Sequence, residues 1–391
     1  MKFDFDKVVD RKGTNCLKYD FARERKMPED VLSLWVADMD FPTAPVILEK
    51  LHKAVDHGIF GYTEGKEAYF HAVHNWYKDH FGWEVERRWL IKTPGVVFGL
   101  AMAVKAYTKE GEGVLIQQPV YYPFSEVIGD NNRVLVNNSL KNMDGHYEID
   151  FEDFEKKIVE NNVKLFILCN PHNPVGRVWT KEELLKLGEI CVKHDVVVVS
   201  DEIHGDFIYP GHQHTVFASL SDEIADITIT CTAPSKTFNL AGLQISNIFI
   251  SNTNLRRKFR KEVAAAGYSQ VNIMGMVSCQ AAYEEGKEWL DQLKDYLAEN
   301  LDFVRTYLKE NIPKVKLIEP EGTYLIWLDF REMGLSKDEL ENLIVNKAKL
   351  WLDSGAVFGE DGIGYQRINI ACPRATLERA LRQLKEAVES L

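Results

Sequence analysis

The sequence predicts an α/β fold, with a large domain built on a parallel or mostly parallel sheet and a smaller carboxy-terminal domain. From about residue 113 to 251, short apolar runs rich in β-branched residues alternate with amphipathic segments. Apolar runs without alternation predict strands that are buried on both faces, which is typical of a sheet covered by helices. The chain has 391 residues, which is enough for one large unit and a smaller partner.

The region from about residue 44 to 110 predicts helices. In its middle part, apolar side chains recur at helical spacing, and Gly82 follows closely as a stop signal. The spaced positions are Tyr69, Phe70, Val73, Trp76 and Tyr77.

Six apolar runs predict the strands of the large sheet, and two strand-like segments follow after a long amphipathic stretch. The six are GVLIQQP, RVLVNNS, VKLFILCN, VVVVSDEI, DITITCTAP and SNIFIS, and the later two are LIEPEGTYLIWLDF and RINIAC. We therefore expect an arm and part of the small domain in residues 1–45, a large domain in 46–285 and the small domain in 286–391.

Composition excludes several classes of protein. A formal charge of −12 and a pI near 5.5 argue against a large nucleic-acid surface, which would need a basic face. We find no apolar stretch of membrane-spanning length and no secretory signal, so a cytoplasmic location is expected. Six cysteines lie without CxxC spacing, and Cys169 and Cys231 end apolar runs. These two are expected to be buried thiols in a reducing compartment rather than metal ligands.

Three polar residues follow successive predicted strands: Asn173 in CNPHNPVG, Asp201 in VVVVSDEIH and Lys236 in TAPSKTFNLAG. Ligands of such sheets bind at the carboxyl ends of the strands. Taken singly, the aspartate could cap a helix and the lysine could be a solvated surface charge. The ordered set, together with a glycine-containing helix start at Thr93–Val97, instead predicts one binding site.

The chain resembles the fold type I enzymes that depend on pyridoxal 5′-phosphate (PLP), the aspartate aminotransferase superfamily, over essentially its whole length. Within them it resembles the MalY/PatB-type cystathionine β-lyase branch, a group of C–S lyases. The resemblance rests on LWVADMDFPTAP, GYTEG, TPGVVFGL, QQPVYYPF, NPHNPVGRVW, SDEIHGDF, APSKTFNLAGLQ and RINIACPR. It implies a seven-stranded, mostly parallel sheet between helices, and a role in amino-acid metabolism such as methionine biosynthesis.

The resemblance implies a role for each cofactor-binding residue. Lys236 would bond covalently to the cofactor aldehyde and later act as a base beside Cα. Asp201 would keep the ring nitrogen protonated, Asn173 would donate to the phenolic oxygen, and Tyr121 would cover the ring. For the phosphate, the matching positions are Gly95, Val96 and Val97 at a helix start, with Ser235 and Tyr62, and His204 is a further cofactor-binding position.

Substrate binding is also implied by the resemblance. Arg367 matches the arginine that forks onto the substrate α-carboxylate, although it could instead form a salt bridge at a strand edge. Ala37 is expected beside the substrate, and Tyr122 could serve catalysis or the substrate. Tyr62 matches a tyrosine that reaches the site of the neighbouring subunit, so a homodimer with shared active sites is implied.

Two positions depart from the aminotransferase pattern. Gln244 stands where many aminotransferases place a phosphate-binding arginine, and His204 stands where they place a tyrosine. Both substitutions favour the C–S lyase branch, although His204 could also be only a packed, hydrogen-bonded side chain.

The sequence thus predicts an enzyme that catalyses β-elimination from L-cystathionine or another cysteine S-conjugate. The alternative is an aminotransferase of class I/II. Both reactions begin with removal of the Cα proton, and a thiol on Cβ is a good leaving group because its pKa is only about 8.5. A catalytically idle PLP-fold protein is a third reading, and the intact Lys236, Asp201 and Asn173 argue against it.

Overall fold

The computed structural model describes residues 2–391, and its centre is a seven-stranded sheet. The strands lie in the order β2-β10-β9-β8-β7-β3-β4, and β10 runs opposite to the other six strands. The prediction of a mostly parallel sheet is therefore confirmed. The strands are β2 Leu90–Thr93, β3 Gly113–Ile116, β4 Val134–Asn137, β7 Leu165–Cys169, β8 Val197–Asp201, β9 Thr228–Thr232 and β10 Ser246–Phe249.

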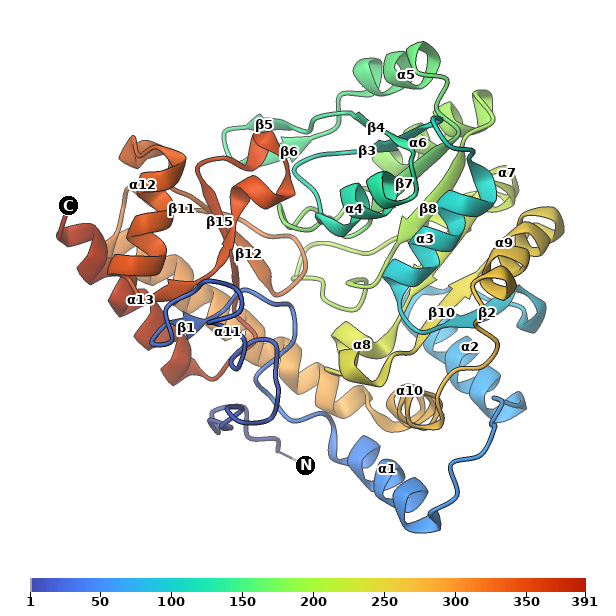
Figure 1. The fold of residues 1–391 in the computed structure, drawn as a ribbon, viewed down its shortest axis with the longest axis horizontal. Helices are drawn as coiled ribbons and strands as arrows, with labels where there is room; N and C mark the ends of the chain where they lie inside the picture. Colours follow the sequence, from blue (N-terminus) through green and yellow to red (C-terminus); the bar gives the residue numbers. More distant parts are fainter. Residues whose placement is uncertain (1) are drawn as a thin grey trace.

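Helices cover both faces of this sheet. Side chains of successive strand residues point to opposite faces, so a continuous apolar strand has two apolar faces to bury. On β7, for example, Leu165 and Ile167 pack with α3, α4 and α9, whereas Phe166 and Leu168 pack with α5 and α6. Figure 1 shows α3, α4 and α9 on the near side of the sheet. The helices are α3 Val96–Tyr107, α4 Pro123–Asp130, α5 Phe151–Glu160, α6 Lys181–Lys193, α7 Asp222–Asp226, α8 Pro234–Thr237 and α9 Thr253–Ala265.

The region 44–110, predicted as helical, contains three α-helices and one strand, with connecting segments between them. Helices α1 Pro45–His57 and α2 Glu67–Phe81 precede β2, and α3 follows it. β2 is an edge strand with alternating half-buried and buried positions, Leu90, Ile91, Lys92 and Thr93, so its four residues carry too little apolar pattern to predict a buried strand.

A second, four-stranded sheet lies towards the carboxy terminus, in the order β11-β12-β15-β14. It contains β11 Lys316–Ile318, β12 Leu325–Asp329, β14 Asp353–Ser354 and β15 Tyr365–Asn369, flanked by α11 Lys287–Asn311, α12 Lys337–Glu341 and α13 Arg374–Glu389. Helix α10, Ile273–Glu285, packs against α1 and α2.

The amino-terminal arm lies beside this second sheet (Figure 1). Strand β1, Leu32–Ser33, pairs in parallel with β13, Leu350–Trp351. Beyond it, the rings of Trp35 and Trp351 stack with centroids 4.8 Å apart. The segment Leu32–Trp35 thus packs against carboxy-terminal elements. A hairpin of β5 Lys141–Met143 and β6 His146–Glu148 completes the strands.

None of the helices within residues 2–391 is long and apolar enough to cross a membrane. All six cysteines have free thiols, and Cys169 and Cys231 are buried, as predicted. Across the same residues, no group of three or more His, Cys, Asp or Glu side chains could hold a metal ion.

Candidate active site

A cavity of about 190 Å³ opens at the carboxyl ends of β7, β8 and β9. The register aligns Cys169, Asp201 and Cys231 across the three strands, so the segments that follow them meet at one edge of the sheet. Most residues predicted from the sequence line this cavity: Ala37, Gly95, Val96, Val97, Tyr121, Asn173, Asp201, His204, Ser235, Lys236 and Gln244.

Lys236 lies on the short helix α8, directly after β9. Its Nζ donates a hydrogen bond to the carbonyl oxygen of Ala37 at 3.2 Å. Burial, with the positive charge of Arg367 nearby, lowers the pKa of Lys236 to about 8, while Asp38 and Asp201 oppose the shift. A lysine with such a pKa has a substantial neutral fraction near neutral pH, which a nucleophile or a general base requires.

Asp201 is the last residue of β8 and is buried. Its Oδ1 accepts a hydrogen bond from the backbone N–H of Ile203 at 3.2 Å. Burial raises the pKa of Asp201 to about 7, because that N–H and the charge of Lys236 only partly offset the desolvation of the carboxylate. A buried carboxylate that lines a cavity and has no ion-pair partner within residues 2–391 suits a cationic group of a ligand.

The amino terminus of α3 lies at the cavity, because Gly95, Val96 and Val97 all line it. Gly95 caps this helix without a side-chain hydrogen bond, so the backbone N–H groups of the first turn are open to a ligand. Twelve aligned peptide units give this end of α3 a partial positive charge, which favours an anion.

Arg367 lies on β15 of the second sheet and reaches the cavity through Asn173. Its Nη1 donates to Asn173 Oδ1 at 3.0 Å, and its Nη2 donates to the carbonyl oxygen of Trp35 at 3.0 Å. Nη2 also forms an ion pair with Asp353. The salt bridge that the sequence left open as an alternative therefore exists, yet Nε of Arg367 is buried and has no hydrogen-bond partner among the described residues. Nε is therefore the guanidinium donor that the described protein groups leave unsatisfied.

His204 lines the cavity and also packs, since its ring meets that of Tyr324 edge-on with centroids 5.8 Å apart. Burial, with the charges of Lys236 and Arg367, lowers the pKa of His204 well below its usual value. The neutral ring has its Nδ1 buried without a hydrogen bond in the part of the chain that the structure describes. His204 is thus a packed side chain in the cavity wall, and its role towards a cofactor stays a prediction.

Three predicted residues do not line the cavity: Arg367, which lies behind Asn173, and Tyr122 and Tyr62. Tyr122 is adjacent to the cavity, with its ring 5.6 Å from that of Tyr121 and 6.1 Å from that of Phe358. Tyr62 is 98% exposed, on the segment between α1 and α2, and does not line the cavity within one chain. A single chain therefore does not bring Tyr62 to the site.

A network of charges lies beside Ala37, and its cations, Lys18 and Arg11, were not predicted from the motifs. Lys18 is fully buried and pairs with Asp40 at 2.9 Å, while Arg11 pairs with Asp40 at 2.8 Å and with Asp38 at 2.6 Å. These residues flank Ala37 in sequence or in space, so the amino-terminal arm fixes the carbonyl group that Lys236 contacts.

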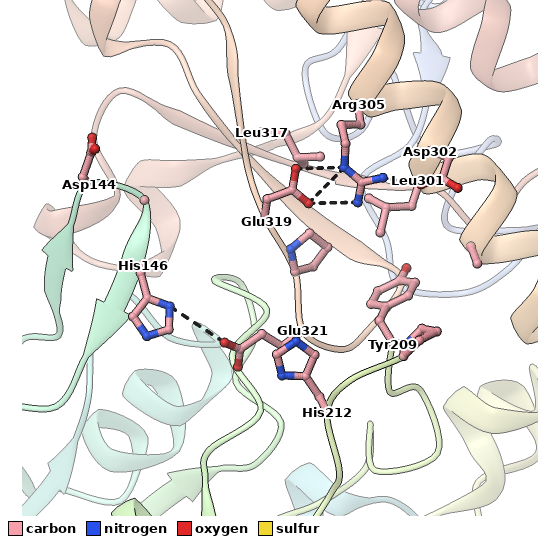
Figure 2. Close-up of a pocket in the computed structure, with 14 residues that line it drawn as sticks. Asp144, His146, Tyr209, His212, Leu301, Asp302, Arg305, Leu317, Glu319 and Glu321 are labelled. Carbon is pink, nitrogen blue, oxygen red and sulfur yellow. Dashed lines mark hydrogen bonds and ion pairs between the residues drawn. The ribbon is translucent and has the colours of Figure 1, made fainter.

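A larger groove of about 600 Å³ lies elsewhere, between the β5–β6 hairpin, α11 and the segment before β12. Figure 2 shows its side chains paired with one another, such as Arg305 with Glu319 and His146 with Glu321. None of its lining residues is a lysine, and it contains none of the residues predicted from the motifs. The smaller cavity, which gathers those residues, is therefore the candidate site.

Residues 29–384 match the family described as aminotransferase class I and II. The chain belongs to this family. It is 46% identical to the cystathionine β-lyase PatB of Bacillus subtilis, over 98% of this chain and 100% of that protein. Solved structures also resemble the chain along essentially its whole length.

Cystalysin of Treponema denticola, whose crystal structure contains a pyridoxal 5′-phosphate cofactor, superposes with a TM-score of 0.96 at 40% identity, and all of both chains is covered. The PLP-bound C–S lyase of Staphylococcus hominis superposes with a TM-score of 0.93 at 34% identity, over 99% of this chain and 98% of that one. The family and fold that the motifs predicted are thereby confirmed.

Proposed function

We propose that this protein is a PLP-dependent carbon–sulfur β-lyase that converts L-cystathionine or a related cysteine S-conjugate into a thiol, pyruvate and ammonia. The observation that carries the proposal is the meeting of Lys236, Asp201 and Asn173 in one buried cavity at the ends of three adjacent strands. The names of the relatives PatB and cystalysin, and of the S. hominis C–S lyase, support the same activity.

The cavity fits PLP at three separate points. The carboxylate of Asp201 has no ion-pair partner among the described residues and suits the protonated ring nitrogen. The amino terminus of α3, with Val96 and Val97, suits the phosphate dianion, and Ser235 and Gln244 line the same cavity. Lys236 lines the cavity and carries the primary amine with which the PLP aldehyde would condense. Tyr121 also lines it and would cover one face of the ring.

Bound PLP supplies an aldehyde that condenses with amines and a ring that withdraws electrons from the substrate Cα. Lys236 would hold the cofactor through its amine, and the same amine, once free, would act as the base beside the substrate Cα. A pKa near 8 suits this task, because a base acts best when its pKa is close to the working pH. Asp201 would pair with the protonated ring nitrogen, whose positive charge would favour the ionised carboxylate.

The substrate carboxylate would bind the guanidinium of Arg367, whose buried Nε has no partner among residues 2–391. Ala37 would lie beside the substrate, since its carbonyl oxygen already accepts from Lys236 and from Tyr324. With the amine and the carboxylate of the substrate fixed, the Cβ–S bond breaks and the sulfur leaves as a thiol. Water then completes the balance: one S-conjugate and one water give one thiol, one pyruvate and one ammonium ion.

We further propose a homodimer in which Tyr62 of one subunit completes the phosphate site of the other. The segment between α1 and α2 exposes Ile59, Phe60 and Tyr62 by 67%, 57% and 98%. Apolar side chains gathered on one projecting segment favour burial against another protein surface.

We also propose the domain bounds that the sequence suggested. Residues 1–45 form an arm and part of the small domain, residues 46–285 form the large domain and residues 286–391 form the small domain. The free thiols favour a cytoplasmic location.

The test is a product assay with purified protein, PLP and L-cystathionine. Pyruvate and thiol formed in equal amounts without a keto-acid acceptor are expected for the lyase. Turnover only when a keto acid is added would instead identify an aminotransferase, and the absence of both products would identify an idle protein. The control variant Lys193→Ala changes an exposed lysine on α6 that pairs with Glu155, far from the cavity in the chain's fold, and should leave the rate unchanged.

A further inference from the structure

Asp353 is a buried carboxylate that touches the guanidinium of Arg367. The two residues face each other across the strand pair β14–β15, where the register places Asp353 opposite Arg367. Oδ2 of Asp353 accepts from Nη2 of Arg367, and both side chains are buried. None of the sequence motifs pointed to Asp353.

The partners of Arg367 fix the orientation of its guanidinium plane. Asn173 accepts from Nη1, and Trp35 and Asp353 accept from Nη2. The ring of Phe358 lies under the guanidinium carbon at 4.9 Å. These contacts leave Nε as the buried donor without a protein partner.

The contact with Asp353 also changes the net charge around Arg367. A carboxylate that contacts a buried guanidinium offsets most of its positive charge for any anion that arrives later. Arg25 is the other cation whose charge acts on Asp353, but Arg25 is exposed and therefore strongly screened by water. The substrate carboxylate thus meets a buried site whose nearest two charges nearly cancel.

We propose that Asp353 is a positioning residue that orients Arg367 and weakens its hold on the substrate α-carboxylate. The inference rests on the proposed function, since it takes Arg367 as the carboxylate site. A weaker hold on the carboxylate is useful in a lyase, because binding that is equally strong before and during the reaction does not raise kcat.

The experiment compares Asp353→Asn with the wild-type holoenzyme, using glycine and ethylamine as probes. Both carry the amine that displaces Lys236, and only glycine carries a carboxylate. Titrations followed by the visible absorbance of the bound cofactor give a Kd for each. We expect the Kd of glycine to fall at least about tenfold in Asp353→Asn, since the amide still accepts from Nη2 but carries no charge. The Kd of ethylamine should stay within about twofold of the wild-type value.

Asp329→Asn is the matched control, because Asp329 is a carboxylate of similar burial in the same sheet whose partner is Arg331. It should change neither Kd. Should Asp353→Asn fail to fold, Asp353→Ala removes the same charge and is compared in the same way. A glycine Kd that is unchanged or raised, or equal shifts for both probes, overturns the inference. Because these titrations need no C–S cleavage, a lack of pyruvate would refute the proposed lyase and still leave the role of Asp353 measurable.

Discussion

The amine of Lys236 lies 3.2 Å from the carbonyl oxygen of Ala37, which is 199 residues earlier in the chain. The same oxygen accepts from the hydroxyl of Tyr324 at 2.8 Å. One carbonyl group thus connects the arm, the end of β9 and the start of β12. The position of the lysine relative to the cavity therefore depends on packing between distant parts of the chain.

Lys236→Ala should abolish turnover of L-cystathionine and the visible absorbance of the lysine-bound cofactor, because alanine offers no amine to the aldehyde. The measurement is an absorbance spectrum with a pyruvate assay. Lys193→Ala, which changes an exposed lysine, should behave as the wild type. An undiminished rate in Lys236→Ala would refute the role of this lysine.

Asp201→Ala should lower kcat by several orders of magnitude, because the protonated ring nitrogen loses its only nearby carboxylate partner in the cavity as described. Steady-state kinetics with saturating PLP separate this loss from weaker cofactor binding. Near wild-type kinetics would contradict the assignment.

Asp201 should also make the stability of the cofactor-free protein depend on pH. Its folded-state pKa of about 7 lies above the unfolded value of about 3.9, so the folded chain binds this proton more tightly. Stability is therefore lost as pH rises through the window from about 4 to about 7. Asp201→Asn lacks this loss, so its Tm relative to the wild type should be higher at pH 8 than at pH 5.

Thermal unfolding of both cofactor-free proteins at the two pH values measures this difference, and Asp329→Asn serves as the control outside the cavity. With PLP added at pH 8, the wild type should have a higher Tm than Asp201→Asn, because the carboxylate then gains a cationic partner. A Tm difference that is the same at both pH values would argue against an unpaired, buried Asp201.

Lys18→Ala should lower the free energy of unfolding by about 3 kcal/mol, because it leaves the buried Asp40 with only part of its charge compensation. Lys53→Ala breaks an exposed pair with Glu49 and should lower it by less than about 1 kcal/mol. Denaturant titration of both variants gives the comparison. Equal losses in the two variants would show that the Lys18 pair is no more important than a surface pair.

Shared active sites predict that two inactive variants can repair each other. A Tyr62→Ala subunit mixed with a Lys236→Ala subunit forms heterodimers in which one of the two sites carries both intact residues. Up to about a quarter of the wild-type activity should return, since half of the dimers are mixed and each has one complete site. No recovery, despite subunit exchange demonstrated by labelled chains, would contradict a shared site.

The strand ends were predictable from the sequence because their signal is local. Asn173, Asp201 and Lys236 each follow a continuous apolar run, and parallel strands bring their carboxyl ends to one edge. The edge strand β2 was missed within a region predicted as helical, since its four residues lack such a run. The antiparallel direction of β10 was likewise not readable, because its run resembles those of its parallel neighbours.

The sequence by itself determined the family, the mostly parallel sheet and the identity of the lysine, the aspartate and the asparagine in the cavity. These properties depend on motifs and on apolar periodicity, both of which are local along the chain. Only the tertiary structure decided that Ala37 accepts from Lys236, that Asp353 pairs with Arg367 and that Lys18 is buried against Asp40. Such contacts join residues that no local pattern relates, and packing alone sets their distances and their charges.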